Sequence, residues 1–165
     1  MTFLGIISNE KDFEIIKSEI LKQVKNLEII CINKKNIKNL QNVRFETLII
    51  DEELSIKPED VHLLEKICKN LKYLIINTDK NKNLDIFSGN RLHVITYGLN
   101  HKCTVTVSSI GEESIMVALQ REILDKYGNL MEIGEKRIKK MQHLDNYGNM
   151  AIFITELIYN KGSKM

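Results

Sequence analysis

The chain has 165 residues, enough to bury one sizeable hydrophobic core but too few for two comfortable domains. Its residues are 43% hydrophobic and 28% charged, as in an ordinary globular protein, and its net charge of +2 is too small to indicate a nucleic-acid or membrane partner. No apolar stretch approaches the roughly 20 residues that a membrane-spanning helix needs.

Three cysteines, Cys31, Cys68 and Cys103, are widely spaced among apolar neighbours. Such an odd set is typical of buried free thiols in a reducing compartment. The chain begins with a short apolar run that no basic segment precedes, which favours a strand over a signal peptide. Cysteine and histidine spacings typical of zinc sites are missing from the sequence. We therefore expect a cytoplasmic protein that uses no metal ion and no cofactor.

The first part of the chain alternates between patterns typical of strands and of helices. Short apolar runs predict strands at residues 3–8, 28–32, 45–50, 73–76 and 92–97. Between these runs, the spacing of apolar residues predicts a helix capped by Asn9, a short helix through Ile37 and Leu40, and a helix that begins at Pro58. Continuous apolar strands that alternate with helices predict a parallel sheet covered on both faces.

The second part of the chain no longer alternates between strand and helix patterns. Residues 104–107 and 115–119 alternate with period two around a turn at Gly111, which predicts an antiparallel hairpin. Residues 130–133 predict a short strand, and residues 136–140, which are mostly basic, are assigned to solvated surface. A last helix is expected between residues 146 and 160, with one apolar face. That face is formed by Met150, Ile154, Leu157 and Ile158.

These patterns together predict a Rossmann-like α/β fold of three layers. A mainly parallel sheet of about five strands is expected to carry an antiparallel β-hairpin extension and a C-terminal helix. Within a single domain, residues 1–100 would form the parallel layer, residues 101–140 the β extension, and residues 141–165 the C-terminal helix and tail.

Polar residues follow the predicted parallel strands, where α/β sheets bind their ligands. The ligand-binding candidates are Asn9, Glu10, Asp51, Asn77, Thr78, Asp79 and Lys102. Helix capping and loop solvation would use the same residue types, so both interpretations stay open. No residue is assigned a catalytic role, because the sequence lacks GxGxxG and GxxxxGK[ST] phosphate loops and a GxSxG nucleophile elbow.

One spacing is similar to that of response-regulator receiver domains. Glu10, Asp51, Thr78 and Lys102 follow the first, third, fourth and fifth predicted strands in that order. The resemblance implies a phosphoacceptor at Asp51, with magnesium held by acids near the first strand. Receiver domains have two adjacent acids at this place, whereas this chain has Asn9 followed by Glu10. The chain also differs in the β extension that follows the fifth predicted strand.

Residues 74–110 resemble the last part of the central domain of Mur ligases, which are ATP-dependent amide ligases. Ile-Ile-Asn-Thr-Asp at 75–79 is similar to their strand ending in Asn-x-Asp-Asp, and Val-Ile-Thr-Tyr-Gly at 94–98 is similar to the next strand. Residues 104–110 resemble the β segment that follows. The arrangement is also similar to that of short bacterial proteins that are not ligases. The resemblance implies that Asn77 would lie beside the adenine of ATP.

The chain departs from the Mur-ligase pattern at the positions that carry the chemistry. Lys80 replaces the second Asp of the motif, and the ATP phosphate loop, the magnesium ligands and the C-terminal substrate domain are missing from the sequence. The resemblance therefore implies a reduced, non-catalytic relative that binds a protein or a small molecule. Alternatives are a nucleotide or metabolite binder that uses the Asn77 edge, and a receiver-like phosphoacceptor. The hairpin edge could also pair with a second copy, which would give a homodimer.

Overall fold

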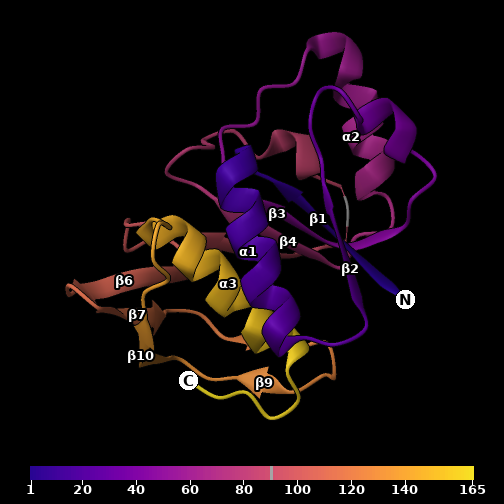
Figure 1. Ribbon diagram of the computed structural model, residues 1–165. Coiled ribbons are helices and arrows are strands. Elements are labelled where there is room, and N and C mark those ends of the chain that lie inside the picture. Colours follow the sequence, from indigo (N-terminus) through magenta and orange to yellow (C-terminus); the bar gives the residue numbers. More distant parts are fainter. Residues whose placement is uncertain (90) are drawn as a thin grey trace.

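The computed structural model describes residues 1–89 and 91–165 and has one large sheet as its centre (Figure 1). The sheet has eight strands in the order β10-β7-β6-β5-β4-β3-β1-β2. These strands are β1 (Thr2–Ile7), β2 (Leu27–Cys31), β3 (Phe45–Ile50), β4 (Tyr73–Asn77), β5 (His93–Tyr97), β6 (Val105–Ile110), β7 (Ser114–Leu119) and β10 (Gly134–Lys139). Neighbours from β2 to β6 pair in parallel, whereas β7 is antiparallel to both β6 and β10.

Helices cover both faces of this sheet. On one face, α1 (Glu10–Gln23) and α3 (Asn146–Tyr159) lie side by side in Figure 1 and share one hydrophobic core with the strands. On the other face, α2 (Val61–Cys68) packs with the 3₁₀ helices η1 (Ile37–Leu40) and η3 (Asp85–Phe87), and η2 (Pro58–Asp60) leads into α2. The predicted α/β fold, with a mostly parallel sheet, an antiparallel hairpin and a C-terminal helix, is confirmed.

The sheet has more strands than the sequence predicted. The hairpin β6–β7 continues the parallel sheet through the pairing of Tyr97 with Val105, so it is not a separate layer. The segment assigned to solvated surface is β10, which pairs with β7 along its whole length. Its charged side chains are exposed because β10 is the edge of the sheet, where lysines discourage pairing with other chains. The predicted strand at 130–133 is the short β9 (Leu130–Met131), paired with β8 (Ile123–Leu124).

The last helix is buried on nearly all sides, although the sequence predicted a single apolar face. In α3, Thr155 is 0% exposed and its Oγ1 donates to the carbonyl of Ala151 at 2.8 Å. Tyr159 Oη lies 2.6 Å from Thr47 Oγ1 of β3. These hydrogen bonds satisfy the hydroxyl groups of Thr155 and Tyr159 in a helix that packs against both the sheet and α1. In the part of the chain that the structure describes, no helix is long and apolar enough to cross a membrane.

Candidate functional site

Asp51 is the central side chain at the carboxyl edge of the parallel strands. It follows β3 directly and is 0% exposed. The Tyr97 hydroxyl, at the end of β5, donates to Asp51 Oδ1 at 2.6 Å, whereas Asp51 Oδ2 is buried with no hydrogen-bond partner among the described residues. Burial raises the pKa of Asp51 to about 6, against the lowering effect of the Tyr97 hydrogen bond. The carboxylate is therefore held in a single position with one oxygen unused.

Two further acids approach Asp51. Oxygen atoms of Asp12, Asp51 and Glu52 all lie within 4.8 Å of one another, and we call these three residues the carboxylate cluster. Asn9 caps α1, because its Oδ1 accepts from the Asp12 backbone N–H at 2.9 Å. The Asn9 amide donates to Asp12 Oδ2 at 2.6 Å, and Lys80 Nζ lies 3.0 Å from Glu52 Oε1. The cap of the first helix therefore fixes the position of one acid beside the end of β3.

Of the sequence-predicted residues, Asn77, Thr78 and Asp79 mainly hold the loop after β4. Asn77 is 0% exposed, and its side chain accepts from the backbone N–H of Asp79 at 3.1 Å and donates to the Asp51 carbonyl at 3.2 Å. Asp79 Oδ2 accepts from the Leu99 N–H at 2.7 Å, and the Thr78 N–H donates to the Tyr97 carbonyl at 3.0 Å. Their polar groups are therefore largely occupied within the protein.

Glu10 and Lys102 lie apart from Asp51. Glu10 is exposed in the first turn of α1 and is not a member of the carboxylate cluster. Lys102 is exposed and lines a hollow of about 290 Å³ together with Thr78 and Asp79, but Asp51 does not line it. The acids that do join Asp51 are Asp12 and Glu52, and neither was among the sequence-predicted candidates. Glu52 directly follows Asp51 in the sequence, whereas Asp12 comes from α1. The available signal for Asp12 was its place three residues after the cap Asn9, on the side of α1 nearest the strand ends.

An apolar crevice opens beside the carboxylate cluster. Strand order reverses between β1 and β3, because β2 lies on the other side of β1. A hollow of about 240 Å³, here called the switch-point crevice, occurs where these three strands end. Its apolar lining is Ile7, Ile32, Ile37, Leu54 and Ile56, and its polar lining includes Asn9 and Glu52. Open α/β sheets place their ligands in the crevice at this point.

The connection from β1 to α1 is too short to hold phosphates. Only Ser8 and Asn9 lie between the end of β1 at Ile7 and the start of α1 at Glu10. A phosphate at a helix N-terminus needs free backbone N–H groups and a positive field. The Asn9 side chain takes one of these N–H groups, and Glu10 and Asp12 place two acids in the first turn. This end of α1 therefore favours cations over anions.

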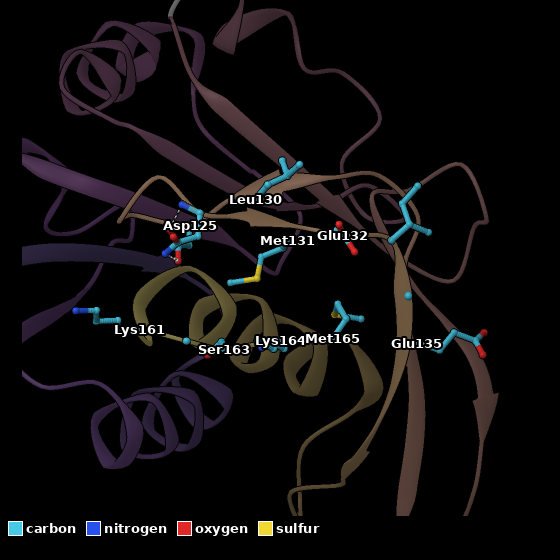
Figure 2. Close-up of a pocket in the computed structure, with 13 residues that line it drawn as sticks. Asp125, Leu130, Met131, Glu132, Glu135, Lys161, Ser163, Lys164 and Met165 are labelled. Atoms are coloured by element: carbon cyan, nitrogen blue, oxygen red, sulfur yellow. Dashed lines mark hydrogen bonds between the residues drawn. The ribbon is translucent and has the colours of Figure 1, made fainter.

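A larger hollow, of about 650 Å³, lies between the β8–β9 turn and the C-terminal tail (Figure 2). Figure 2 shows Met131 pointing toward Ser163 across this space, whereas Leu130 points away from it. Tyr73, the first residue of β4, donates to the Leu124 carbonyl, so this region adjoins the amino end of the sheet, opposite the carboxylate cluster. None of the seven sequence-predicted candidates lines it.

The arrangement is that of a Rossmann-like α/β domain whose crevice lies at the reversal of strand order. No protein-family model matches the chain, and no curated protein matches its sequence. Among solved structures, it is similar to MurF from Acinetobacter baumannii, with a TM-score of 0.57 and 9% sequence identity. The similarity covers 96% of this chain and 42% of that chain. The protein therefore has a Mur-ligase-like fold and spans less than half the length of that ligase.

Proposed function

We propose that the protein is a non-catalytic binding domain on a Mur-ligase-like fold, and that it binds a small, mainly apolar ligand in the switch-point crevice. The observation that carries this proposal is the position of an apolar hollow at the reversal of strand order. Ligand sites are typically concave and apolar with a few polar groups, and Asn9 and Glu52 supply such groups here.

The lack of a phosphate-loop motif in the sequence supports a reduced relative of the ligases. Amide ligases of this type activate a carboxyl group by transfer of a phosphoryl group from ATP, which requires groups that neutralise the charge of the phosphates. The sequence has no phosphate loop, and the two-residue connection at Ser8 and Asn9 leaves no room for one. The acids Glu10 and Asp12 would repel phosphates at the same place.

The burial of Asp51 counts against a phosphoacceptor role. Phosphoryl transfer to a carboxylate requires an oxygen that the phosphoryl donor can approach. Asp51 is 0% exposed, Tyr97 occupies one of its oxygens, and Lys102 lines a different hollow. These observations favour ligand binding over phosphotransfer as the function of this edge.

The binding proposal can be tested by NMR of isoleucine methyl groups, because isoleucines line the crevice. We expect indole and benzyl alcohol at millimolar concentration to shift the methyl signals of Ile7, Ile32 and Ile56, which line it. Ile133, in the hollow of Figure 2, is the internal control and should not shift. ATP with magnesium should produce no shift beyond that of magnesium chloride alone.

Two outcomes would contradict the proposal. If the two aromatic probes shift no crevice methyl group, or shift Ile133 in preference to them, the crevice is not the binding site. If ATP shifts the crevice methyl groups beyond the magnesium control, the edge binds nucleotides and the alternative interpretation replaces the proposal.

We also propose that residues 1–165 fold as one domain, because a single core contains residues of β1, β7 and α3. Ile115 of β7 is 1% exposed within that core, so Ile115→Val should cost about 1 kcal/mol of unfolding free energy. Far-UV circular dichroism and tyrosine fluorescence should then report one urea transition, displaced equally for both signals. Two separate transitions, of which only one moves, would indicate that the second half folds by itself.

A further inference from the structure

The carboxylate cluster has more negative charge than its described partners neutralise. Asp12, Asp51 and Glu52 approach within 4.8 Å of one another, and Lys80 is the basic side chain that forms an ion pair with one of them. Like charges at this separation repel each other, most strongly where burial lowers the effective dielectric constant. The neighbouring amide of Asn9 donates hydrogen bonds to Asp12 and Glu52 but carries no charge.

A second observation points independently to a ligand. Asp51 is fully buried, and its Oδ2 has no hydrogen-bond partner among the described residues. A buried carboxylate oxygen without a partner is costly, because it has lost water and gained nothing in return. Tyr97 holds the other oxygen at 2.6 Å, which fixes the orientation of the carboxylate. The unused oxygen therefore belongs to a rigid group within the cluster.

The ligand chemistry selects the kind of ion. Oxygen-only sites of carboxylates suit hard divalent cations such as Mg²⁺, Mn²⁺ and Ca²⁺, which bind at about 2.0–2.6 Å. Two oxygens bound to one such ion are at most about 4–5 Å apart, which agrees with the 4.8 Å spread of the cluster. Asp12 and Glu52 are partly exposed, so water can reach the ion and complete its coordination.

We propose that Asp12, Asp51 and Glu52 bind one hard divalent cation at the carboxyl end of β3. Asp51 supplies the fixed buried ligand, and Asp12 and Glu52 close over the ion from α1 and from the loop after β3. Lys80, bound to Glu52, competes with the ion for this carboxylate. The site does not depend on occupancy of the switch-point crevice.

Manganese binding by the full chain provides the direct test, because Mn²⁺ broadens the NMR signals of nearby nuclei. We expect saturable binding of one Mn²⁺, competed by Mg²⁺, with broadening strongest at the amides of Asn9, Asp12 and Glu52. At a hundred times its dissociation constant, Mn²⁺ should raise the thermal midpoint by about 5–10 °C. Potassium chloride at the same ionic strength is the control for screening and should not reproduce this increase.

Two variants locate the ion, and a third is their matched control. Asp12→Asn and Glu52→Gln should each weaken Mn²⁺ binding at least about tenfold, since each removes one charged ligand. Both side chains are partly exposed, and the Asn9 cap uses the backbone N–H of Asp12, so the variants should remain folded. Glu53→Gln makes the same charge change one residue away and should bind like the unmodified chain.

The proposal is overturned by either of two results. One is the absence of saturable Mn²⁺ binding by the folded chain up to about 10 mM. A dissociation constant above that concentration would be weaker than those of the weak calcium sites of extracellular modules. The other is equal affinity of Asp12→Asn, Glu52→Gln and Glu53→Gln, which would assign any bound Mn²⁺ to a different surface. Neither result bears on the isoleucine methyl shifts, so the cation site and the crevice can fail separately.

Discussion

Asp51→Asn is expected to gain about 3 kcal/mol of unfolding free energy relative to the unmodified chain between pH 4 and pH 7.5, in the absence of divalent cations. The pKa of Asp51 is raised from its ordinary 3.8 to about 6, chiefly by burial. Between these two pH values the unfolded chain releases the proton while the folded chain keeps it, so stability falls as the pH rises. Two pKa units correspond to about 3 kcal/mol, and asparagine does not titrate.

Besides burial, four neighbouring groups act on the pKa of Asp51. Asp145 and Glu52 raise its pKa further, whereas the hydrogen bond from Tyr97 and the charge of Lys80 lower it. When the free energies of unfolding of the variant and the unmodified chain are subtracted at each pH, the contributions of groups that titrate equally in both cancel.

Urea unfolding at half-unit intervals of pH, in EDTA, would measure this difference. Glu53→Gln is the control, since an exposed side chain should change stability by no more than about 0.5 kcal/mol over the range. A constant difference between Asp51→Asn and the unmodified chain would show that Asp51 ionises as readily in the folded protein as in the unfolded chain. If the proposed cation site exists, excess Mg²⁺ should reduce the difference above pH 6, because the ion stabilises the charged carboxylate of the unmodified chain.

The parallel layer was predictable because burial on both faces leaves a simple pattern. β4 reads as an apolar run from Tyr73 to Ile76, β3 ends in three apolar residues, and the Asn9 cap marks the start of α1 directly. A short apolar run and a helix cap depend only on neighbouring residues and not on distant contacts. The strand ends, and with them most candidate positions, were therefore placed within a residue or two.

The features that the sequence did not predict, the strand β10 and the extent of burial of α3, are those whose environment is set by distant segments. β10 alternates weakly and is mostly charged, because its edge position leaves its side chains in water, and only pairing with β7 reveals it as a strand. α3 is apolar on several sides because α1 covers it, a contact between segments more than a hundred residues apart. Its periodicity therefore indicated a helix but not the extent of its burial.

The candidate site, too, was predictable only where it depends on residues close in the sequence. The sequence predicted that Asp51 and Asn77 lie at one sheet edge, since both follow parallel strands, and the Asn77 amide does donate to the Asp51 carbonyl. The Asn9 cap marks Asp12 as a first-turn acid, but only the folded arrangement shows that Asp12, and not Glu10, lies beside Asp51. The partner of the carboxylate, Tyr97, read as a core residue of a strand, and its hydroxyl gave no separate signal.

Asn77→Ala is expected to lower the free energy of unfolding by about 3–5 kcal/mol. We do not expect the substitution to remove a direct contact with a ligand. Asn77 is 0% exposed, and its side chain bonds to the backbone N–H groups of Asp79 and Lys80 and to the carbonyl of Asp51. Removal of the amide leaves the buried Asp51 carbonyl and the partly buried N–H groups of Asp79 and Lys80 without this partner, and a buried group left so costs about 1–3 kcal/mol. The loop after β4 would lose the turn that positions Asp79 and Lys80, so the damage would reach the carboxylate cluster indirectly.

Equilibrium urea unfolding is the measurement, and Asn83→Ala is the matched control. Asn83 also accepts from a backbone N–H two residues on, at 2.9 Å, but it is exposed, so its loss should cost less than about 1 kcal/mol. A cost for Asn77→Ala as small as that of the control would mean that its amide is free to meet a ligand, as the Mur-ligase resemblance implies for an adenine contact. A large cost would instead explain why an asparagine is needed at the end of β4 in a chain with no phosphate loop, since the turn requires it whether or not a nucleotide binds.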